Sequence, residues 1–280
     1  MTIKGYWRII RPVNSIVAGL AAALAYLIAT GTLIPSVIFL VVIVILITGA
    51  GNTINDYFDV SIDRVNQPER PLPSGTVSMT GALFFAGILF TAGILVSFFT
   101  NPYCAFFAVF NSLLLIAYAK SLKSTPLYGN LSVAYLSGSI FLFGGAFAGL
   151  SGLVNNSVIA LITIFAMLAR ELLKDAEDVP GDILAGAKTF PVLYGVRLAV
   201  IISIIFTGIA VVVSFYPYYR WGALYLAGII PVDFIILYSA WRASGCGSPK
   251  CIKECRVTSY LKYGMFASLI VFTLAALFLP

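Results

Sequence analysis

Residues 52–75 read NTINDYFDVSIDRVNQPERPLPSG and hold four of the chain's eleven carboxylates, after an almost uncharged stretch of some twenty residues. Asn55, Asp59 and Asp63 follow one another at intervals of four, so on a helix each step turns only ~40° and the three form one polar stripe. Asp56 borders this stripe. Negative charge gathered on one face is costly unless a cation occupies it, and carboxylate oxygens suit Mg²⁺. The stretch predicts either a magnesium site or a solvated helix end just outside a membrane.

The composition around this stretch is that of a membrane protein. The chain has 280 residues, of which 60% are hydrophobic and 10% charged, whereas globular chains carry about 25% charged residues. The net charge of +6 is therefore interpreted through membrane topology, and no nucleic-acid partner is expected. The chain contains no histidine, which excludes histidine bases and histidine metal or haem ligands and favours carboxylates as metal ligands. The basic start leads into an apolar span long enough to stay in the bilayer, so no cleavable signal peptide is expected.

Apolar runs of about 20 residues, separated by proline, glycine and charge, predict nine transmembrane helices. The expected fold is all-α: one polytopic domain over residues 1–280, with the nine helices bundled around a central cavity. The predicted spans are 12–30, 35–56, 79–99, 102–119, 129–149, 156–174, 192–214, 219–241 and 258–279.

The distribution of Lys and Arg predicts the orientation. With these spans, sixteen of the seventeen basic residues fall on one side and only Arg220 falls on the other. Because cytoplasmic loops carry the excess of positive charge, the protein is expected in the cell membrane with its N-terminus cytoplasmic and its C-terminus outside. The oligomeric state is left open.

A second acidic set lies in residues 170–182, which read RELLKDAEDVPGD and follow the sixth span. Asp175 and Asp178 are three residues apart and can share a helix face. Pro180 and Gly181 are expected to break the helix, so that Asp182 returns toward the other two acids through a turn.

Both acidic sets follow even-numbered spans, so both are expected at the cytoplasmic face. Together they could hold two or three Mg²⁺ ions, which bridge naturally to a diphosphate and neutralise it as a leaving group. Cations on the same face could reach phosphate oxygens, although topology alone would also place them there. These cations are Arg64, Arg70, Lys120, Lys123, Lys174 and Lys188.

The chain resembles the UbiA superfamily of intramembrane prenyltransferases over essentially its whole length. Asn55-x₃-Asp59-x₃-Asp63 matches the first aspartate-rich motif of that family, and Asp178-x₃-Asp182 matches the second. Four further segments are similar: Arg-Pro-x-Asn (11–14), Arg-Pro-Leu-Pro-Ser-Gly (70–75), Pro-Leu-x-Gly-Asn (126–130) and Gly-x-Lys-Thr (186–189). Many relatives carry Tyr-x₃-Lys after the fourth span. Here Tyr118 is followed by Lys120 and Lys123, so which lysine meets the diphosphate stays open.

The resemblance implies a reaction and its residues. Mg²⁺ on Asn55, Asp59, Asp63, Asp178 and Asp182, bordered by Asp56 and Asp175, would bind a polyprenyl diphosphate. The four aspartates of the two motifs would be catalytic, and the departing diphosphate would leave an allylic carbocation for an acceptor to capture. The resemblance also adds Asn14 and Tyr118 to the basic residues expected to contact substrate.

The acceptor is the least determined part. The sequences of residues 169–175 and 126–130 are most similar to the archaeal ether-lipid branch of the family. That branch joins geranylgeranyl diphosphate to geranylgeranylglyceryl phosphate, a lipid acceptor. One alternative is an aromatic acceptor, such as a quinone precursor. Another is a cation-coupled transporter that uses the acids as an ion path, for which intramembrane carboxylates would be expected.

Four residues stand apart from this picture. Asp233, near the middle of the eighth span, must be paired, protonated or turned to a cavity, because a lipid-facing charge there would cost several kcal/mol; it is predicted to be a second-tier cavity residue. Cys246, Cys251 and Cys255 have spacings unlike those of a zinc site and are predicted to be reduced bystander thiols.

Overall fold

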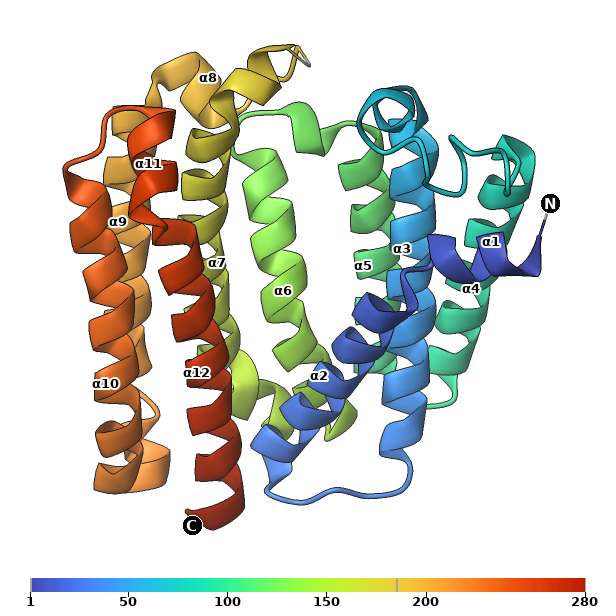
Figure 1. The fold of residues 1–280 in the computed structure, drawn as a ribbon. Coiled ribbons are helices and arrows are strands. Elements are labelled where there is room, and N and C mark those ends of the chain that lie inside the picture. Colours follow the sequence, from blue (N-terminus) through green and yellow to red (C-terminus); the bar gives the residue numbers. More distant parts are fainter. Residues whose placement is uncertain (1, 185, 280) are drawn as a thin grey trace.

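The structure, a computed structural model, describes residues 2–184 and 186–279, and all regular elements in this part of the chain are helices (Figure 1). In chain order they are α1 (Ile3–Ile9), α2 (Pro12–Thr30), α3 (Val37–Asn66), α4 (Met79–Phe98), α5 (Pro102–Lys120), η1 (Leu122–Ser124), α6 (Tyr128–Phe147), α7 (Leu150–Leu184), α8 (Phe190–Tyr194), α9 (Val196–Ser214), α10 (Tyr218–Ser244), α11 (Pro249–Cys255) and α12 (Val257–Phe278).

The nine predicted spans are confirmed. Within the described residues, nine helices are long and apolar enough to cross a membrane, namely α2 to α7, α9, α10 and α12. Large apolar side chains such as Phe84, Leu113 and Phe234 point outward and are exposed. In water this surface would be unfavourable, whereas in a bilayer it contacts lipid. The chain is a multi-pass membrane protein.

The helices form two groups, each with its own core. One buried cluster joins α7, α9, α10 and α12, and the other joins α2, α3, α4, α5 and α6. Figure 1 shows the two groups on opposite sides of the molecule, with α6 and α7 at their junction and α2 crossing in front. Each half thus has its own core, and α2 contributes to both, with Ile28 in the first cluster and Tyr26 in the second.

Small residues allow close helix contacts at this junction. A Cβ added to Gly145 of α6 would lie 2.4 Å from the carbonyl oxygen of Gly152 in α7, and one added to Gly144 would lie 2.5 Å from the Cβ of Ala25 in α2. Such approaches are typical of membrane helices, whose association depends on packing rather than on exclusion of water.

Two long helices extend beyond their apolar parts and carry the acids. The apolar run of α3 ends near residue 54, but its helix continues to Asn66, where the backbone N–H of Gln67 donates to the carbonyl of Asp63 at 2.8 Å. The turn that follows returns to α1, since the N–H of Thr2 donates to the carbonyl of Thr76 at 3.0 Å. The acids of α3 thus lie on a helical extension that a folded turn holds in place.

The predicted break at Pro180 and Gly181 is wrong, because α7 continues to Leu184. Proline removes only its own N–H bond and crowds the preceding turn, and here Pro180 is exposed in the last turns of the helix. The end is fastened at Asp182, whose carboxylate accepts from the Thr189 hydroxyl at 2.8 Å and whose carbonyl accepts from the Ala187 N–H at 2.9 Å. Asp182 therefore follows Asp178 on one continuous helix instead of returning through a turn.

The prediction of reduced thiols is wrong for Cys246 and Cys251, which form a disulfide, and is confirmed for Cys255, which is free. The Ser248 side chain accepts from the Cys251 N–H and starts α11 directly after the loop, which brings the two Cα atoms to 5.5 Å, within the usual range for a disulfide. The Sγ of Cys255 lies 3.8 Å from that of Cys246. The spacing of the cysteines alone did not predict that a helix begins between Cys246 and Cys251 and brings them together.

Candidate active site

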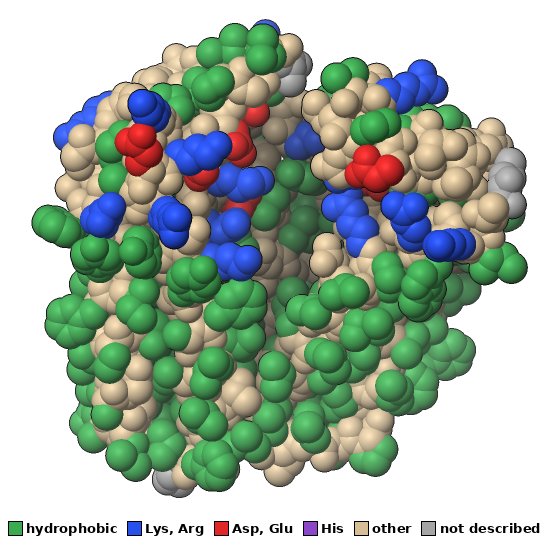
Figure 2. Space-filling model, in the orientation of Figure 1, with side chains coloured by type: hydrophobic (Ala, Val, Ile, Leu, Met, Phe, Trp, Pro, Cys, Tyr) green, Lys and Arg blue, Asp and Glu red, His purple; other side chains and the backbone are tan. Residues whose placement is uncertain are grey.

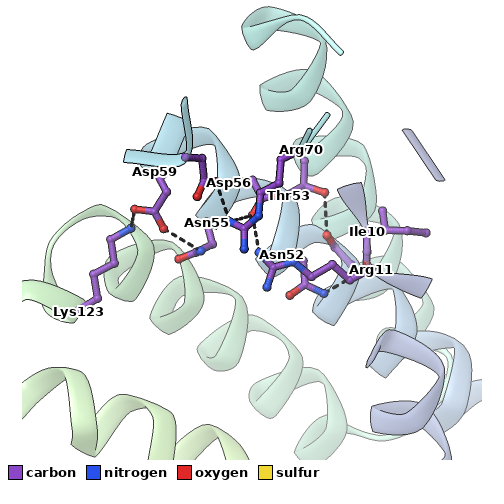
Figure 3. Close-up of polar contacts among 11 residues, drawn as sticks. Ile10, Arg11, Asn52, Thr53, Asn55, Asp56, Asp59, Arg70 and Lys123 are labelled. Carbon is purple, nitrogen blue, oxygen red and sulfur yellow. Dashed lines mark hydrogen bonds and ion pairs between the residues drawn. The ribbon is translucent and has the colours of Figure 1, made fainter. Parts of the chain in front are cut away.

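The acids of α3 divide between two directions (Figure 3). Asn55 donates to Asp59 at 3.0 Å, and Asp59 forms an ion pair with Lys123 from the connection after α5. Asp56 instead accepts from Arg11, the residue before α2, at 2.5 Å and lies 3.5 Å from Arg70, and its side chain is only 3% exposed.

Asp63 belongs to the second direction. Its carboxylate pairs with Arg70 at 2.7 Å, so Arg70 binds both Asp56 and Asp63. Asp56 and Asp63 are seven residues apart, so on a helix their side chains point within about 20° of each other. Asn55 and Asp63 are eight residues apart, and their directions differ by about 80°. The predicted stripe of three is thus twisted. Asn55 and Asp59 face α5, and Asp63 is turned toward Arg70.

The acids of α7 occupy one face of its last turns. Asp175 accepts from the side-chain amide of Asn130 in α6 at 2.8 Å, and Asp182 is held by Thr189. Asp178 is exposed between them, and Lys174 lies within electrostatic reach of Asp175 and Asp182. The continuous helix gives these acids the spacing i, i+3, i+7, which keeps them on one face.

The two sets lie at the same end of the bundle. Tyr118 of α5 is within electrostatic reach of Asp59 on one side and Asp175 on the other. The connections after α5 and α7 meet as well, because the N–H of Lys188 donates to the carbonyl of Ser124 at 3.2 Å. Figure 2 shows acidic and basic side chains gathered in the upper part of the molecule, above a mainly hydrophobic surface, with a hollow between the two halves.

Two cavities extend from this region into the bundle. The first has a volume of about 430 Å³ between α2, α3, α5 and α6, with Arg11, Asn52, Asn55 and Tyr118 at its polar end. The second has a volume of about 500 Å³ between α2, α6, α7, α9, α10 and α12. Both volumes fall in the ~300–1,000 Å³ range of small-molecule sites. Ala18, Ser137 and Ile140 line both cavities, so the two cavities adjoin along these three residues.

The remaining predicted residues have mixed placements. Asn14 and Asp233 line the second cavity, where Asp233 is buried and accepts from the Ser214 hydroxyl at 2.7 Å. Arg64, Lys120 and Lys188 are exposed and line neither cavity.

Several residues of the site were missed. Arg11, Asn130 and Thr189 lie inside sequence segments that resemble the family, and their polar side chains there were an available signal. Arg170, at the second cavity, lies inside residues 169–175, which resemble the ether-lipid branch, whereas Lys262 had no signal besides its side of the membrane.

The donor chemistry of the two sets fits Mg²⁺. Carboxylate and side-chain amide oxygens suit a hard cation, and histidine is absent from the chain. Over residues 2–184 and 186–279, no three carboxylates bring their oxygens within 4.8 Å of one another; the one group of three side chains that close consists of the disulfide cysteines Cys246 and Cys251 with the free Cys255. The acids therefore form no closed cage by themselves. This arrangement suits Mg²⁺, which keeps waters and binds substrate phosphates along with one or two carboxylates.

Comparisons with known proteins agree with this architecture. The model of the UbiA prenyltransferase family matches residues 15–278. The digeranylgeranylglyceryl phosphate synthase of Methanoregula boonei is 54% identical over 279 residues, covering 100% of both chains. A solved structure described as giving insight into digeranylgeranylglyceryl phosphate synthase in membranes superposes with a TM-score of 0.90 at 33% identity, covering 98% of each chain.

A more distant structure shares the fold. The UbiA homolog from Archaeoglobus fulgidus bound to GPP and Mg²⁺ has a TM-score of 0.67 at 17% identity and covers 94% of this chain and 99% of its own. With a family match over nearly all of the chain and relatives of equal length, the chain belongs to the UbiA prenyltransferase family.

Proposed function

We propose that this protein transfers a geranylgeranyl group from geranylgeranyl diphosphate to geranylgeranylglyceryl phosphate and releases diphosphate. The observation that carries the proposal is the pair of acidic sets, on α3 and α7, at one end of a bundle that contains two largely apolar cavities, the first of which reaches Asn55. A reaction between two lipids needs two such slots, and a diphosphate leaving group needs a concentrated site for divalent cations. The name of the Methanoregula relative supports the choice of substrates.

Mg²⁺ is the proposed cofactor, held by Asn55, Asp59 and Asp63 from α3 and by Asp178 and Asp182 from α7, with Asp175 beside them. When bound, it would neutralise the charge that develops on the departing diphosphate. The Mg²⁺ bound to the A. fulgidus homolog supports this assignment.

The side chains of this protein supply the rest. Lys123 forms an ion pair with Asp59. Its ammonium group is therefore positioned beside the first acidic set, where it could also contact a diphosphate bound between the acids of α3 and those of α7. Arg70 holds Asp63 and so fixes the last acid of α3. The apolar walls of the cavities keep water away from the allylic carbon while its bond to the diphosphate breaks, which leaves the acceptor hydroxyl as the available nucleophile.

The proposed orientation places this site in the cytoplasm. Sixteen of seventeen basic residues support it, and the C-terminus lies at the opposite end of the bundle from α8 and the turn after α3 (Figure 1). Cysteines introduced as Asn66→Cys and Leu184→Cys, in separate variants with the native cysteines replaced, should label with a membrane-impermeant reagent only from the cytoplasmic side. Labelling of the two positions from opposite sides would contradict the topology.

The function is tested with purified protein, Mg²⁺, labelled geranylgeranyl diphosphate and three acceptors: the glyceryl phosphate lipid, the same lipid without phosphate, and a phenolic quinone precursor. The glyceryl phosphate lipid should be prenylated fastest. Faster prenylation of the phenol would replace the proposal by the aromatic alternative. Family membership already argues against the transporter, since the family is one of prenyltransferases.

A further inference from the structure

The second cavity has a cationic end that is separate from the acidic sets. Arg170 of α7, Lys262 of α12 and Asn14 of α2 line it, and none of the proposed metal ligands does. Arg170 lies five residues before Asp175, so on the helix it is about 7.5 Å deeper in the bundle than the nearest acid of that set. The second cavity can therefore receive an anion that no metal ion contacts.

These two cations are available to a ligand. Arg170 uses Nη1 for an ion pair with Glu171 at 2.5 Å, which leaves its other guanidinium nitrogens. Lys262 is exposed and makes no ion pair in the described part of the chain. By contrast, Lys123 and Arg70 are engaged with Asp59 and Asp63. Arg170 is thus matched by an acid, as Lys123 and Arg70 are, and the surplus positive charge of the second cavity lies on Lys262.

The rest of the second cavity suits an apolar chain. Its walls include Val17, Phe141, Met167 and Phe266. At its deep end the Ser214 hydroxyl donates to one carboxylate oxygen of Asp233 at 2.7 Å, and the Tyr225 hydroxyl donates to the carbonyl of Ser214 at 2.7 Å. Both hydroxyl donors therefore have a hydrogen-bond acceptor within the protein and do not require one from a ligand. A molecule with an anionic head and an isoprenoid tail therefore fits this cavity along its length.

The first cavity has the complementary character. Its polar end includes Asn55 of the first acidic motif, and Asn55 donates to Asp59. A prenyl chain in this cavity would have its diphosphate at the metal site. Because the two cavities adjoin at Ala18, Ser137 and Ile140, a lipid in the second cavity would lie beside a prenyl chain in the first.

We propose that the second cavity is the acceptor site, in which Arg170 and Lys262 bind the phosphate monoester of the glyceryl lipid without a metal ion. This inference rests on the proposed function and adds to it a place and a headgroup contact for the acceptor. A phosphate monoester carries about −1.5 to −2 charges at pH 7. The guanidinium offers it a planar fork and the ammonium a point charge, a combination that an uncharged acceptor would not need.

The first test measures equilibrium binding of the acceptor in EDTA, without donor. Wild-type protein should bind the glyceryl phosphate lipid in EDTA and should bind geranylgeranyl diphosphate only when Mg²⁺ is present. Arg170→Gln and Lys262→Met should each weaken acceptor binding about 10–150-fold, the usual loss for one charge-assisted contact. Arg170→Lys should restore part of it. Lys250→Met, which removes the same charge from an exposed side chain outside both cavities, is the control and should bind like wild type.

The second test asks whether the two cations act on the phosphate. The phosphate-free lipid should bind wild-type protein weakly, and neither substitution should weaken it further, because the two changes remove the same interaction. Donor affinity in Mg²⁺ should stay at the wild-type value in both variants, which also shows that they are folded.

The outcomes separate the two proposals. Equal weakening of both lipids, loss of donor binding alone, or acceptor binding that requires Mg²⁺ would overturn the acceptor site. Tight metal-free binding of the glyceryl phosphate lipid without its prenylation would support the site and overturn the proposed function.

Discussion

Asp56→Asn and Asp59→Asn are the same substitution three residues apart on α3, and they should have opposite consequences. Asp56 is buried and paired with Arg11 and Arg70, whereas Asp59 faces Lys123 and Asn55 at the polar end of the first cavity. Asp56→Asn should reduce stability and leave Mg²⁺ dependence unchanged. Asp59→Asn should reduce Mg²⁺-dependent activity and should cost less stability than Asp56→Asn, because the Asp59 side chain is 19% exposed and that of Asp56 only 3%.

The cost at Asp56 follows from its contacts. Breaking a fully buried ion pair costs about 3–5 kcal/mol, but the Arg11 side chain is 33% exposed and can be rehydrated, and Arg70 keeps Asp63 at 2.7 Å. Asn also keeps one oxygen as an acceptor. The expected loss is therefore that of a charge-assisted hydrogen bond, about 1.5–3 kcal/mol, or a fall in melting temperature of roughly 3–12 °C.

The cost at Asp59 is expected in activity. Removing a partner of a metal ligand typically costs about 10–100-fold in metal affinity or activity, so loss of a ligand should cost at least as much. The assay combines thermal unfolding in detergent with Mg²⁺ titration of prenyl transfer for both variants. If Asp56→Asn shifts the Mg²⁺ half-saturation as far as Asp59→Asn does, with its melting temperature unchanged, the division of α3 into two directions is refuted.

Lys123→Met should weaken geranylgeranyl diphosphate binding about 10–150-fold, whereas Lys120→Met, at an exposed position outside both cavities, should change it by less than about twofold; equal effects in binding titrations would contradict this choice of lysine. EDTA should abolish turnover and added Mg²⁺ should restore it, and full activity in EDTA would remove the metal from the reaction. Gly144→Ala should cost about 1–3 kcal/mol in thermal unfolding because its Cβ would crowd α2. Its control, Gly87→Ala, has open space and should be neutral or stabilising by up to about 1 kcal/mol; similar losses at both glycines would contradict the packing argument.

The spans were predictable from the sequence because an apolar run of about 20 residues is a signal of composition. The same signal hid the full length of α3 and α7. Their apolar parts end well before Asn66 and Leu184, and the predicted second and sixth spans end at residues 56 and 174. Charge marks where a helix leaves the apolar layer but not where it stops. For that reason the helical extensions that carry the acids were not seen as helices of this length.

The residue types of the site were predictable from the sequence, but the direction in which each acidic side chain points was less so. Periodicity places Asp56, Asp59 and Asp63 within one sector of a helix, but their partners decide which way each carboxylate turns. Arg11 is 45 residues from Asp56, and Arg70 reaches Asp63 only because the turn after α3 folds back. Such contacts depend on tertiary packing, which spacing does not contain.

The contact between the two cavities has a kinetic consequence. A product with two isoprenoid tails on one glycerol would lie across Ala18, Ser137 and Ile140, with one tail in each cavity. Neither tail could then leave alone, because the glycerol ties them together. Departure of the product should therefore be slower than its formation, as in many enzymes where release limits turnover. The first turnover should appear as a burst, with an amplitude that counts the active sites.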